Sequence, residues 1–363
     1  MDSENIVVRS KKIRIYPKEK MQVNKYFGLS RYWFNQAIEY LKNEETKAYL
    51  PKVRKIQQKE HPEWAFDCPQ RIREHAIADA VKAVKNAKSK FLKEKTYQNV
   101  KFRSKKNPSQ VFGFDKQSLK ENFVFTKKKF RSFFKSSENF NNVELEGIRI
   151  KCENDRFFLV IPEKRKIKQP ENQRLPYVSI DPGVRTFATT FSPELTTKIG
   201  DGDFNHIYRL CINVDKLISK ISKAKSKQKR RMKKALNRLK WKIKDLINEL
   251  HYKVARFLVT RFEKIYLPTF ETSEMVTKLK SKTARNMLTF AHFRFKSFLK
   301  AKAKEYSCQV IDVSEAYTSK TCSFCGKIHK IGSKSVLKCQ CGIKIDRDIN
   351  GARGILLKNL CEL

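Results

Sequence analysis

The spacing of apolar residues predicts one strand and two long helices at the start of the chain. Residues 6–16 alternate as a strand does, and residues 23–41 carry apolar side chains at intervals of three and four, the period of a helix face. Residues 69–95 repeat that helical spacing, with basic residues on the flanks of the apolar face. These patterns predict a small helical lobe over residues 21–95.

Between residues 101 and 164 the apolar period changes to two, which predicts short strands separated by turns. Together with the N-terminal strand they predict a small antiparallel barrel or sheet over residues 1–20 and 96–170. Its many phenylalanines alternate as buried positions do, so we interpret them as core, with base-stacking platforms as the alternative. Residues 165–176 are polar, contain two prolines and read as a linker.

The second half of the chain opens with a predicted hairpin. An apolar strand over residues 177–180 enters Asp181-Pro182-Gly183, and a second strand follows over residues 186–191. A long helical element then carries an apolar stripe from Leu217 to Leu250, and further patterns predict a helix over 285–303 and a strand over 308–313.

The charge balance indicates a polyanionic partner. The chain has 80 Lys and Arg against 37 Asp and Glu, a formal charge of +43, and such self-repulsion favours nucleic acid as the partner. Between Lys216 and Lys244 there are 14 basic residues and no acidic one, which favours phosphate contact over a solvated face of mixed sign. Nucleic-acid contacts are expected at Arg31, Arg71, Arg103, Lys105, Lys229, Arg230, Arg231, Lys233 and Lys234.

The same composition argues against a membrane protein. No apolar run approaches the roughly 20 residues that span a bilayer, and no N-terminal signal is visible. The basic clusters at residues 164–168 and 227–234 are also compatible with nuclear import, so we expect a nuclear protein, with the cytoplasm as the alternative.

Four of the nine cysteines crowd into a 20-residue segment, as a C-x2-C pair and a C-x-C pair. This pattern predicts a metal site in a reducing compartment rather than a disulfide framework. Four thiolates suit tetrahedral zinc and leave no open coordination position, so the zinc is expected to be structural. His329 is a substitute ligand if the narrow C-x-C pair cannot close the site. The expected zinc ligands are Cys322, Cys325, Cys339 and Cys341.

Three carboxylates near this ribbon are the candidate catalytic residues. Asp181 ends a strand, Glu315 comes just before the ribbon and Asp348 just after it. Two divalent ions held by converging carboxylates can activate a water and stabilise a leaving oxygen at one phosphodiester. For Asp348 alone, a helix cap is an equally good interpretation.

At these residues the chain resembles the TnpB and Fanzor family of transposon-associated nucleases. Residues 179–187 are similar to the first RuvC motif of that family, residues 317–326 to the entry into its zinc ribbon, and residues 346–352 to its third RuvC motif. The resemblance implies an α/β fold plus a β-barrel: an RNase H-like (RuvC) nuclease domain over 171–363 with a zinc-ribbon insert at 317–343, preceded by a wedge β-barrel and a helical recognition lobe. Weaker landmarks of those two parts are residues 31–35 and 102–106.

The second RuvC motif departs from the family pattern. Where a TnpB-like chain would place Glu at the end of the strand over 264–267, this chain has Pro268, which cannot bind a metal. Fanzor proteins resemble this arrangement, with the lost Glu replaced by one shortly before the ribbon. Glu315 matches that position, and Glu271 and Glu274 remain rival candidates. The C-x-C pair is a second departure, because the family usually has C-x2-C.

The resemblance implies an RNA-guided, Mg²⁺-dependent endonuclease for double-stranded DNA that uses a guide RNA and reads a short target-adjacent DNA motif. Asp181, Glu315 and Asp348 are then the magnesium ligands. The alternatives are a guided DNA-binding protein without cleavage and a DNA-strand-transfer transposase. The oligomeric state is not fixed by the sequence, and a monomer is favoured.

Overall fold

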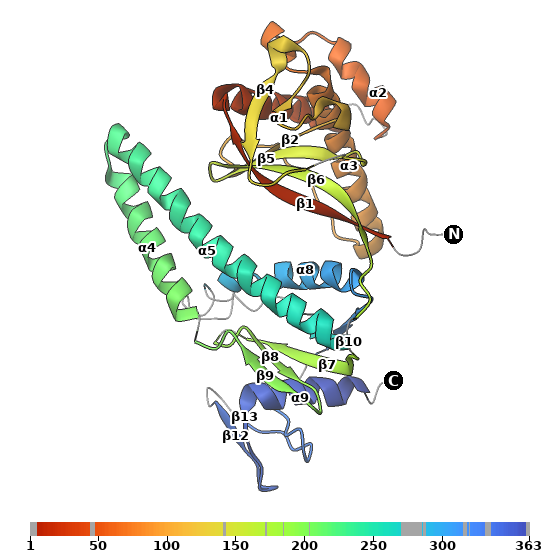
Figure 1. Cartoon of the computed structure of the whole chain (residues 1–363), viewed down its shortest axis with the longest axis vertical. Coiled ribbons are helices and arrows are strands. Elements are labelled where there is room, and N and C mark those ends of the chain that lie inside the picture. Colours follow the sequence, from red (N-terminus) through yellow and green to blue (C-terminus); the bar gives the residue numbers. More distant parts are fainter. Residues whose placement is uncertain are drawn as a thin grey trace. The chain divides into compact units, whose positions relative to one another are not determined.

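The chain forms two compact units, each described here by itself (Figure 1). This computed structural model describes residues 6–43, 48–140, 143–170, 173–183, 185–202, 204–269, 285, 288–314, 318, 320–330 and 335–360. One unit comprises Val8–Lys164, and the other comprises Arg165–Leu363 together with residues 1–7. No described helix is both long enough and apolar enough to cross a bilayer.

A curled six-stranded sheet forms the first layer of the N-terminal unit. Its order is β2-β5-β6-β1-β4-β3, with antiparallel pairing of β2 to β5, β5 to β6, β1 to β4 and β3 to β4. The strands expected from the two-residue period are confirmed. Their bounds are β1 (Ile6–Pro17), β2 (Ser109–Phe114), β3 (Phe123–Val124), β4 (Ser132–Ser136), β5 (Ile148–Glu153) and β6 (Arg156–Lys166).

Helices α1 (Lys20–Asn43) and α3 (Gln70–Glu94) form the second layer, as expected, with the short α2 (Leu50–Arg54) beside them. Phe27 of α1 packs with Phe112, Phe114 and Phe157 of the strands, and the last three are buried. The interpretation of these phenylalanines as core is therefore confirmed. Because α1 contributes to the core of the sheet, the helices and strands share one compact unit.

The C-terminal unit contains a five-stranded sheet of order β11-β10-β7-β8-β9. The expected hairpin is present as β7 (Leu175–Pro182) and β8 (Ala188–Phe191), and β9 (Thr196–Ile199) extends it antiparallel. Strands β10 (Phe262–Pro268) and β11 (Gln309–Val313) run parallel to β7. Three antiparallel strands continued by two parallel ones make the expected RNase H-like sheet. β9 was not expected, since its four residues carry little apolar signal.

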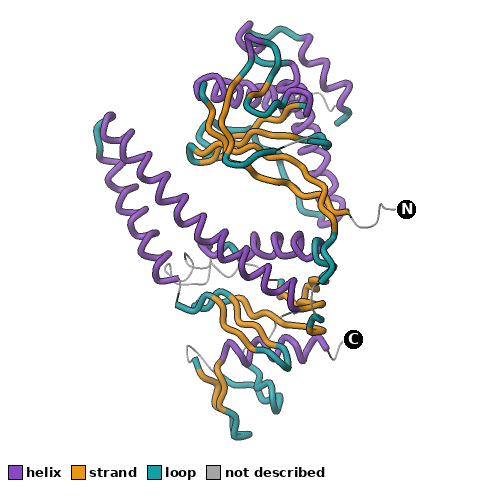
Figure 2. Tube along the Cα trace, viewed as in Figure 1, coloured by secondary structure: helices purple, strands orange, loops and turns teal. Residues whose placement is uncertain are grey.

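Helices cover both faces of this sheet (Figures 1 and 2). On one face α5 (Ser226–Arg261) and α8 (His292–Lys304) pack over Val178 and Ile180 of β7, and on the other face α9 (Arg347–Leu360) packs with Tyr177. Because successive side chains of a strand point to opposite faces, alternate residues of β7 face alternate layers. The face that meets α9 carries the odd-numbered residues.

The single helix expected across residues 216–250 is wrong. The chain forms α4 (Phe204–Lys223), reverses at residues 224–225 and returns as α5. Val214 and Ile221 of α4 pack against Leu236 of α5, so the apolar stripe that predicted one helix is buried between two. The helix expected over residues 285–303 is confirmed as helical structure with a break: residues 285 and 288–290 are helical, Ala291 has φ 52°, and α8 follows from His292.

Candidate active site and zinc ribbon

Asp181 lies at the end of β7 on the face that meets α9. Two residues earlier on the same face, the Ser179 hydroxyl donates a hydrogen bond to the Ala352 carbonyl of α9, at 2.6 Å. A Cβ placed on Gly351 would lie 2.5 Å from Oδ2 of Asp181. The Asp181 carboxylate therefore rests directly against the backbone of α9, in space left open by a glycine.

Strand register brings the end of β10 toward the end of β7. Tyr266 of β10 pairs with Ser179 of β7, and each strand continues at least two residues further, through Pro268 and Asp181 respectively. Pro268 pairs with Val313 of β11. The position where a TnpB-like chain would supply Glu carries no side-chain ligand atom here.

The candidates for the missing carboxylate, Glu315, Glu271 and Glu274, lie outside the described residues. Val313, two residues before Glu315 in the sequence, ends the described part of β11 and packs with Ile355 and Leu356 of α9. The choice of third ligand remains a prediction.

Asp346 caps α9, whereas Asp348 does not. Oδ1 of Asp346 accepts the backbone N–H of Asp348 at 2.9 Å and of Ile349 at 3.3 Å, and Oδ2 accepts from Lys198 Nζ at 2.6 Å. Burial alone would raise the pKa of Asp346, but the Lys198 and backbone donors lower it overall. Capping, which the sequence left open for Asp348, is performed by its neighbour, and the Asp348 carboxylate is available for another role.

Asp348 lies one helical turn before Gly351, on the same face of α9. Burial raises the pKa of Asp348, and the nearby Asp346 carboxylate raises it further. Burial and a neighbouring negative charge both disfavour the charged form of Asp348. A bound cation would offset both effects, so this carboxylate gains more from a cation than an exposed one would. The Asp181 carboxylate therefore meets α9 one helical turn from Asp348. Carboxylate oxygens are ligands that Mg²⁺ prefers, and the sharing of an ion by these two residues remains a prediction.

Buried aromatic rings support the loop after Asp181. His292, the first residue of α8, donates from Nε2 to the Gly183 carbonyl at 3.1 Å and stacks on Phe187 with ring centroids 5.0 Å apart. A Cβ on Gly183 would lie 2.6 Å from the Thr186 carbonyl oxygen, so this tight turn requires glycine. Burial lowers the pKa of His292 to about 4, so at neutral pH it is an uncharged donor.

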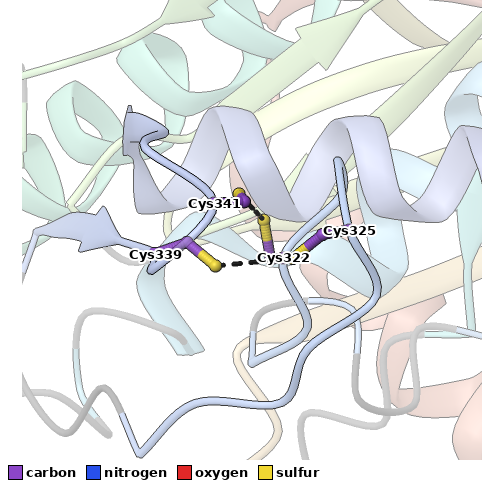
Figure 3. A group of neighbouring side chains, drawn as sticks. All are labelled: Cys322, Cys325, Cys339 and Cys341. Carbon is purple, nitrogen blue, oxygen red and sulfur yellow. Dashed lines mark hydrogen bonds between the residues drawn. The ribbon is translucent and has the colours of Figure 1, made fainter.

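The four ribbon cysteines converge, with ligand atoms all within 4.8 Å of one another (Figure 3). Sγ of Cys322 lies 3.8 Å from Sγ of Cys341, and Sγ of Cys325 lies 3.4 Å from Sγ of Cys339. A tetrahedral zinc with bonds of about 2.3 Å places its sulfurs about 3.8 Å apart, so the spacing of these four sulfurs, including the narrow C-x-C pair, fits such an ion. Glycine at 326 and 342 adopts φ 76° and 87°, as the two knuckles require.

Two contacts tune these thiols. His329 Nε2 lies 3.2 Å from Sγ of Cys339, so this imidazole is positioned to donate to the thiolate or to replace it. Burial alone would raise the pKa of Cys322, but the backbone amides of Cys325 and Phe324 lower it to about 7. Cys322 thus favours the thiolate form that binds zinc. At Cys341 a backbone contact with Ile343 lowers the pKa, but the neighbouring thiols raise it overall to about 12.

Three of the arginines expected at nucleic acid already have partners within the protein. Arg103 pairs with Asp79 at 2.9 Å and lies 3.8 Å over the Phe34 ring. Arg71 pairs with Asp115 at 2.7 Å, and Arg31 donates to the Gln110 side chain at 2.9 Å. These contacts join α1 and α3 to β2 and to the residues on either side of it, and the role of the three arginines at nucleic acid remains a prediction.

The remaining basic candidates are solvent-facing. Lys105 is exposed. The others lie near the start of α5, where the α4–α5 hairpin turns, and all but the half-buried Lys229 are exposed: Arg230, Arg231, Lys233 and Lys234. This tip, residues 229–234, is free to meet phosphate.

Two family models match the chain. OrfB_IS605, a probable transposase, matches residues 149–279, and the Cas12f1-like TNB domain matches residues 292–355, which include the ribbon and the first half of α9. The chain is 30% identical over 387 residues to the putative transposase A625R of Paramecium bursaria Chlorella virus 1, covering 97% of this chain and 87% of that protein. The chain belongs to the TnpB/IS605 transposase family. The resemblance read from its motifs is confirmed.

Other comparisons agree with this membership. The TnpB-family chain is 26% identical to the TnpB-like protein L79 of Acanthamoeba polyphaga mimivirus, covering 97% of this chain and 73% of that protein. Its fold is similar to a solved Cas12f1-sgRNA-target DNA complex, with a TM-score of 0.62 at 14% identity over 97% of this chain and 99% of that one. The particular closeness to Fanzor proteins stays a prediction.

Proposed function

We propose that this TnpB-family chain is an RNA-guided, Mg²⁺-dependent endonuclease for double-stranded DNA. The observation that carries the proposal is the contact of the Asp181 carboxylate with α9 at Gly351, one turn from Asp348. Membership of a family related to Cas12f1, a CRISPR-associated endodeoxyribonuclease, supports nuclease chemistry at this junction.

Asp181 and Asp348 would hold Mg²⁺, with Glu315 as the third ligand in preference to Glu271. Bound Mg²⁺ supplies the positive charge that activates a water and stabilises the leaving oxygen of a phosphodiester. The chain's own contribution is to hold the carboxylates in place. Ser179 fixes α9 against β7, and Asp346 holds the N-terminus of α9 without using Asp348.

The basic charge of the chain and its similarity to a solved Cas12f1 complex support nucleic acids as partners. The basic tip at residues 229–234 suits phosphate, and the similar Cas12f1 structure is a complex with an sgRNA and target DNA. We propose that a guide RNA selects the target by base pairing while the protein reads a short adjacent motif. The parts played by a wedge barrel (1–20 and 96–170), a recognition lobe (21–95) and a ribbon (317–343), a monomeric state, and a nuclear location belong to the same proposal.

The test is cleavage by the purified protein with its copurified RNA. The RNA is sequenced, and a plasmid library carrying the matching target beside randomised flanks is added with Mg²⁺. Wild type is expected to cut, and the Asp181→Asn and Asp348→Asn variants are expected to bind RNA and target but not cut. Loss of cutting in Glu315→Gln, with Glu271→Gln still active, would identify the third ligand.

The alternatives give different outcomes in the same assay. Binding without cleavage by wild type at every Mg²⁺ concentration would indicate a guided DNA-binding protein. Joining of DNA ends that persists after the RNA has been digested would indicate a strand-transfer transposase. Either result contradicts the proposal.

A further inference from the structure

The ribbon contacts α9 on the side away from β7. Asn350 is fully buried: its side-chain oxygen accepts the Ser323 backbone N–H at 3.0 Å, and its Nδ2 donates to the Thr321 carbonyl at 2.8 Å. Thr321 and Ser323 are the two neighbours of the zinc ligand Cys322. The carboxamide thus makes one acceptor and one donor contact around a single cysteine, a pairing that an aspartate could not make.

Arg353 extends this contact by one helical turn. Its Nη1 donates to the Ser323 carbonyl at 3.0 Å and to the Ser323 hydroxyl at 3.1 Å, and its guanidinium lies 3.7 Å from the centre of the Phe324 ring. Positions 350, 353 and 354 form one face of α9, since they are three and four residues apart. At Gly354 a Cβ would lie 3.3 Å from the Thr318 carbonyl oxygen, so this face approaches the ribbon closely.

The opposite face of these two turns of α9 contacts Asp181 and Ser179 of β7. Gly351 receives the Asp181 carboxylate, and the Ala352 carbonyl accepts from Ser179. Within residues 350–353, the first and last contact the cysteine knuckle, and the middle two contact Asp181 and Ser179. The contacts with the knuckle and the contacts with Asp181 and Ser179 therefore lie within about one turn of helix.

We propose that the zinc knuckle controls the carboxylate site through this link, with Asn350 and Arg353 as positioning residues. A filled knuckle holds residues 321–324 in the conformation that binds Asn350, and an emptied one releases the first turns of α9. Asp348 and Gly351 then lose their places relative to Asp181. The regulatory consequence rests on the proposed function, whereas the link between the knuckle and α9 does not.

Reciprocity makes the link measurable without any cleavage. If bound zinc lowers the free energy of the folded first turns of α9, then loss of the contacts between α9 and the knuckle must weaken zinc binding by the same free energy. We expect Asn350→Ala to lower zinc affinity about tenfold or more, because it removes two buried hydrogen bonds. Asn359→Ala is the matched control. Asn359 is also a buried amide of α9, but its Nδ2 donates within the helix to the Ile355 carbonyl.

The experiment measures zinc affinity with a competing chromophoric chelator, and amide hydrogen exchange across α9 with zinc bound, removed and restored. In wild type, zinc removal is expected to speed exchange in the first half of α9 about tenfold or more, and added zinc is expected to restore protection. In Asn350→Ala that exchange is expected to be fast with or without zinc, while Asn359→Ala behaves as wild type. If Asn350→Ala fails to fold, Arg353→Lys serves instead, since it keeps the charge and loses the paired contacts.

Two results would overturn the link: unchanged α9 exchange when zinc is removed from wild type, or wild-type zinc affinity in both positioning variants. Cleavage is a separate readout. A wild type that never cuts DNA would defeat the proposed function while leaving the exchange and affinity results interpretable. In an active wild type, Asn350→Ala should require several-fold more Mg²⁺.

Discussion

Oδ2 of Asp181 lies 2.5 Å from the point where a side chain on Gly351 would begin. The two residues are 170 positions apart in sequence and meet because β7 packs on α9. A glycine inside a helix costs roughly 0.5–1 kcal/mol relative to alanine. At Gly351 the absence of a side chain leaves room on the surface of α9 for the Asp181 carboxylate, which offsets this loss of helix stability.

Gly351→Ala should separate activity from stability. The added methyl forces the Asp181 side chain to rotate away, and a misplacement of about 1 Å at a catalytic group can cost about 100-fold in rate. We expect cleavage to fall about 100-fold or more, while the melting temperature changes little because alanine favours the helix. Single-turnover cleavage and thermal unfolding measure the two effects.

Gly28→Ala is the control for this substitution. A Cβ there would meet only Arg31 Nη2, at 3.7 Å, an ordinary contact on α1. Cleavage within about twofold of wild type is expected on general grounds of surface tolerance. Full activity in Gly351→Ala would mean that the Asp181 position is irrelevant to the reaction.

Asp348→Asn should stabilise the metal-free protein. The pKa of Asp348 is raised, so its charged form is disfavoured in the folded state, and the penalty is greatest at neutral pH and disappears as acid protonates the group. We expect the melting temperature without divalent ions to rise by roughly 1–3 °C at pH 7, and not below pH 4. Added Mg²⁺ should stabilise wild type and leave the variant unaffected.

Asp346→Asn provides the comparison, because its side-chain oxygen can still cap α9. Asp346 has a lowered pKa, so its charge stabilises the fold, and the variant should melt at or below the wild-type temperature. An equal rise in both variants would contradict the distinct roles assigned to the two carboxylates.

The C-terminal unit should lose stability in mild acid. Burial lowers the pKa values of His251 and His292 to about 4 from an ordinary value of 6.5, so the unfolded chain takes up protons first as the pH falls. Above pH 6.5 both rings are neutral in the folded and unfolded chain, and the free energy of unfolding is unaffected. Below pH 6.5 the free energy of unfolding falls, until the folded rings also take up protons at about pH 4. The loss is about 3 kcal/mol for each histidine.

Denaturant unfolding between pH 7 and pH 4 measures this slope. His292→Gln keeps a side-chain donor that can reach the Gly183 carbonyl but cannot gain a proton in this range. The variant should have a lower free energy of unfolding at pH 7. On acidification its free energy of unfolding should fall less steeply than that of wild type, by the slope that one bound proton contributes. A slope identical to that of wild type would show that His292 is not the titrating group.

The tip of the α4–α5 hairpin should set part of the salt dependence of nucleic-acid binding. Changing Arg230, Arg231, Lys233 and Lys234 to Gln removes four exposed charges. If all four meet phosphate, the slope of log affinity against log salt should become shallower by about 3, since each contact contributes roughly 0.7–0.9. Filter binding of the copurified RNA and of target DNA at several salt concentrations gives the slope.

Lys253→Gln is the control on the same helix. Lys253 is 73% exposed and pairs with Glu249 at 3.2 Å, so its charge already has a partner in the protein. The slope should not change in this variant. An unchanged slope in the fourfold variant would place the phosphate contacts elsewhere on the chain.

Local pattern was enough for most of the elements and for the cysteine cluster. The period-two strands of the N-terminal sheet, the hairpin that turns after Asp181 and the spacing of Cys322 to Cys341 all depend on residues close in the chain. Burial of one face of an element leaves a direct trace in its sequence. The reversal between α4 and α5 left no such trace, because the same apolar stripe fits one exposed helix or two that bury it against each other.

Only the tertiary structure showed which of the two acidic residues at the start of α9 caps the helix. As local sequence either Asp346 or Asp348 could do so, although the family resemblance singled out Asp348 as a metal ligand. Asp346 caps the helix with one oxygen and pairs with Lys198 of β9 through the other, while Asp348 stays half-buried one turn from Gly351. A short-range pattern carries no record of contacts between residues more than 100 positions apart, such as those of Lys198 with Asp346 and of Asp181 with Gly351.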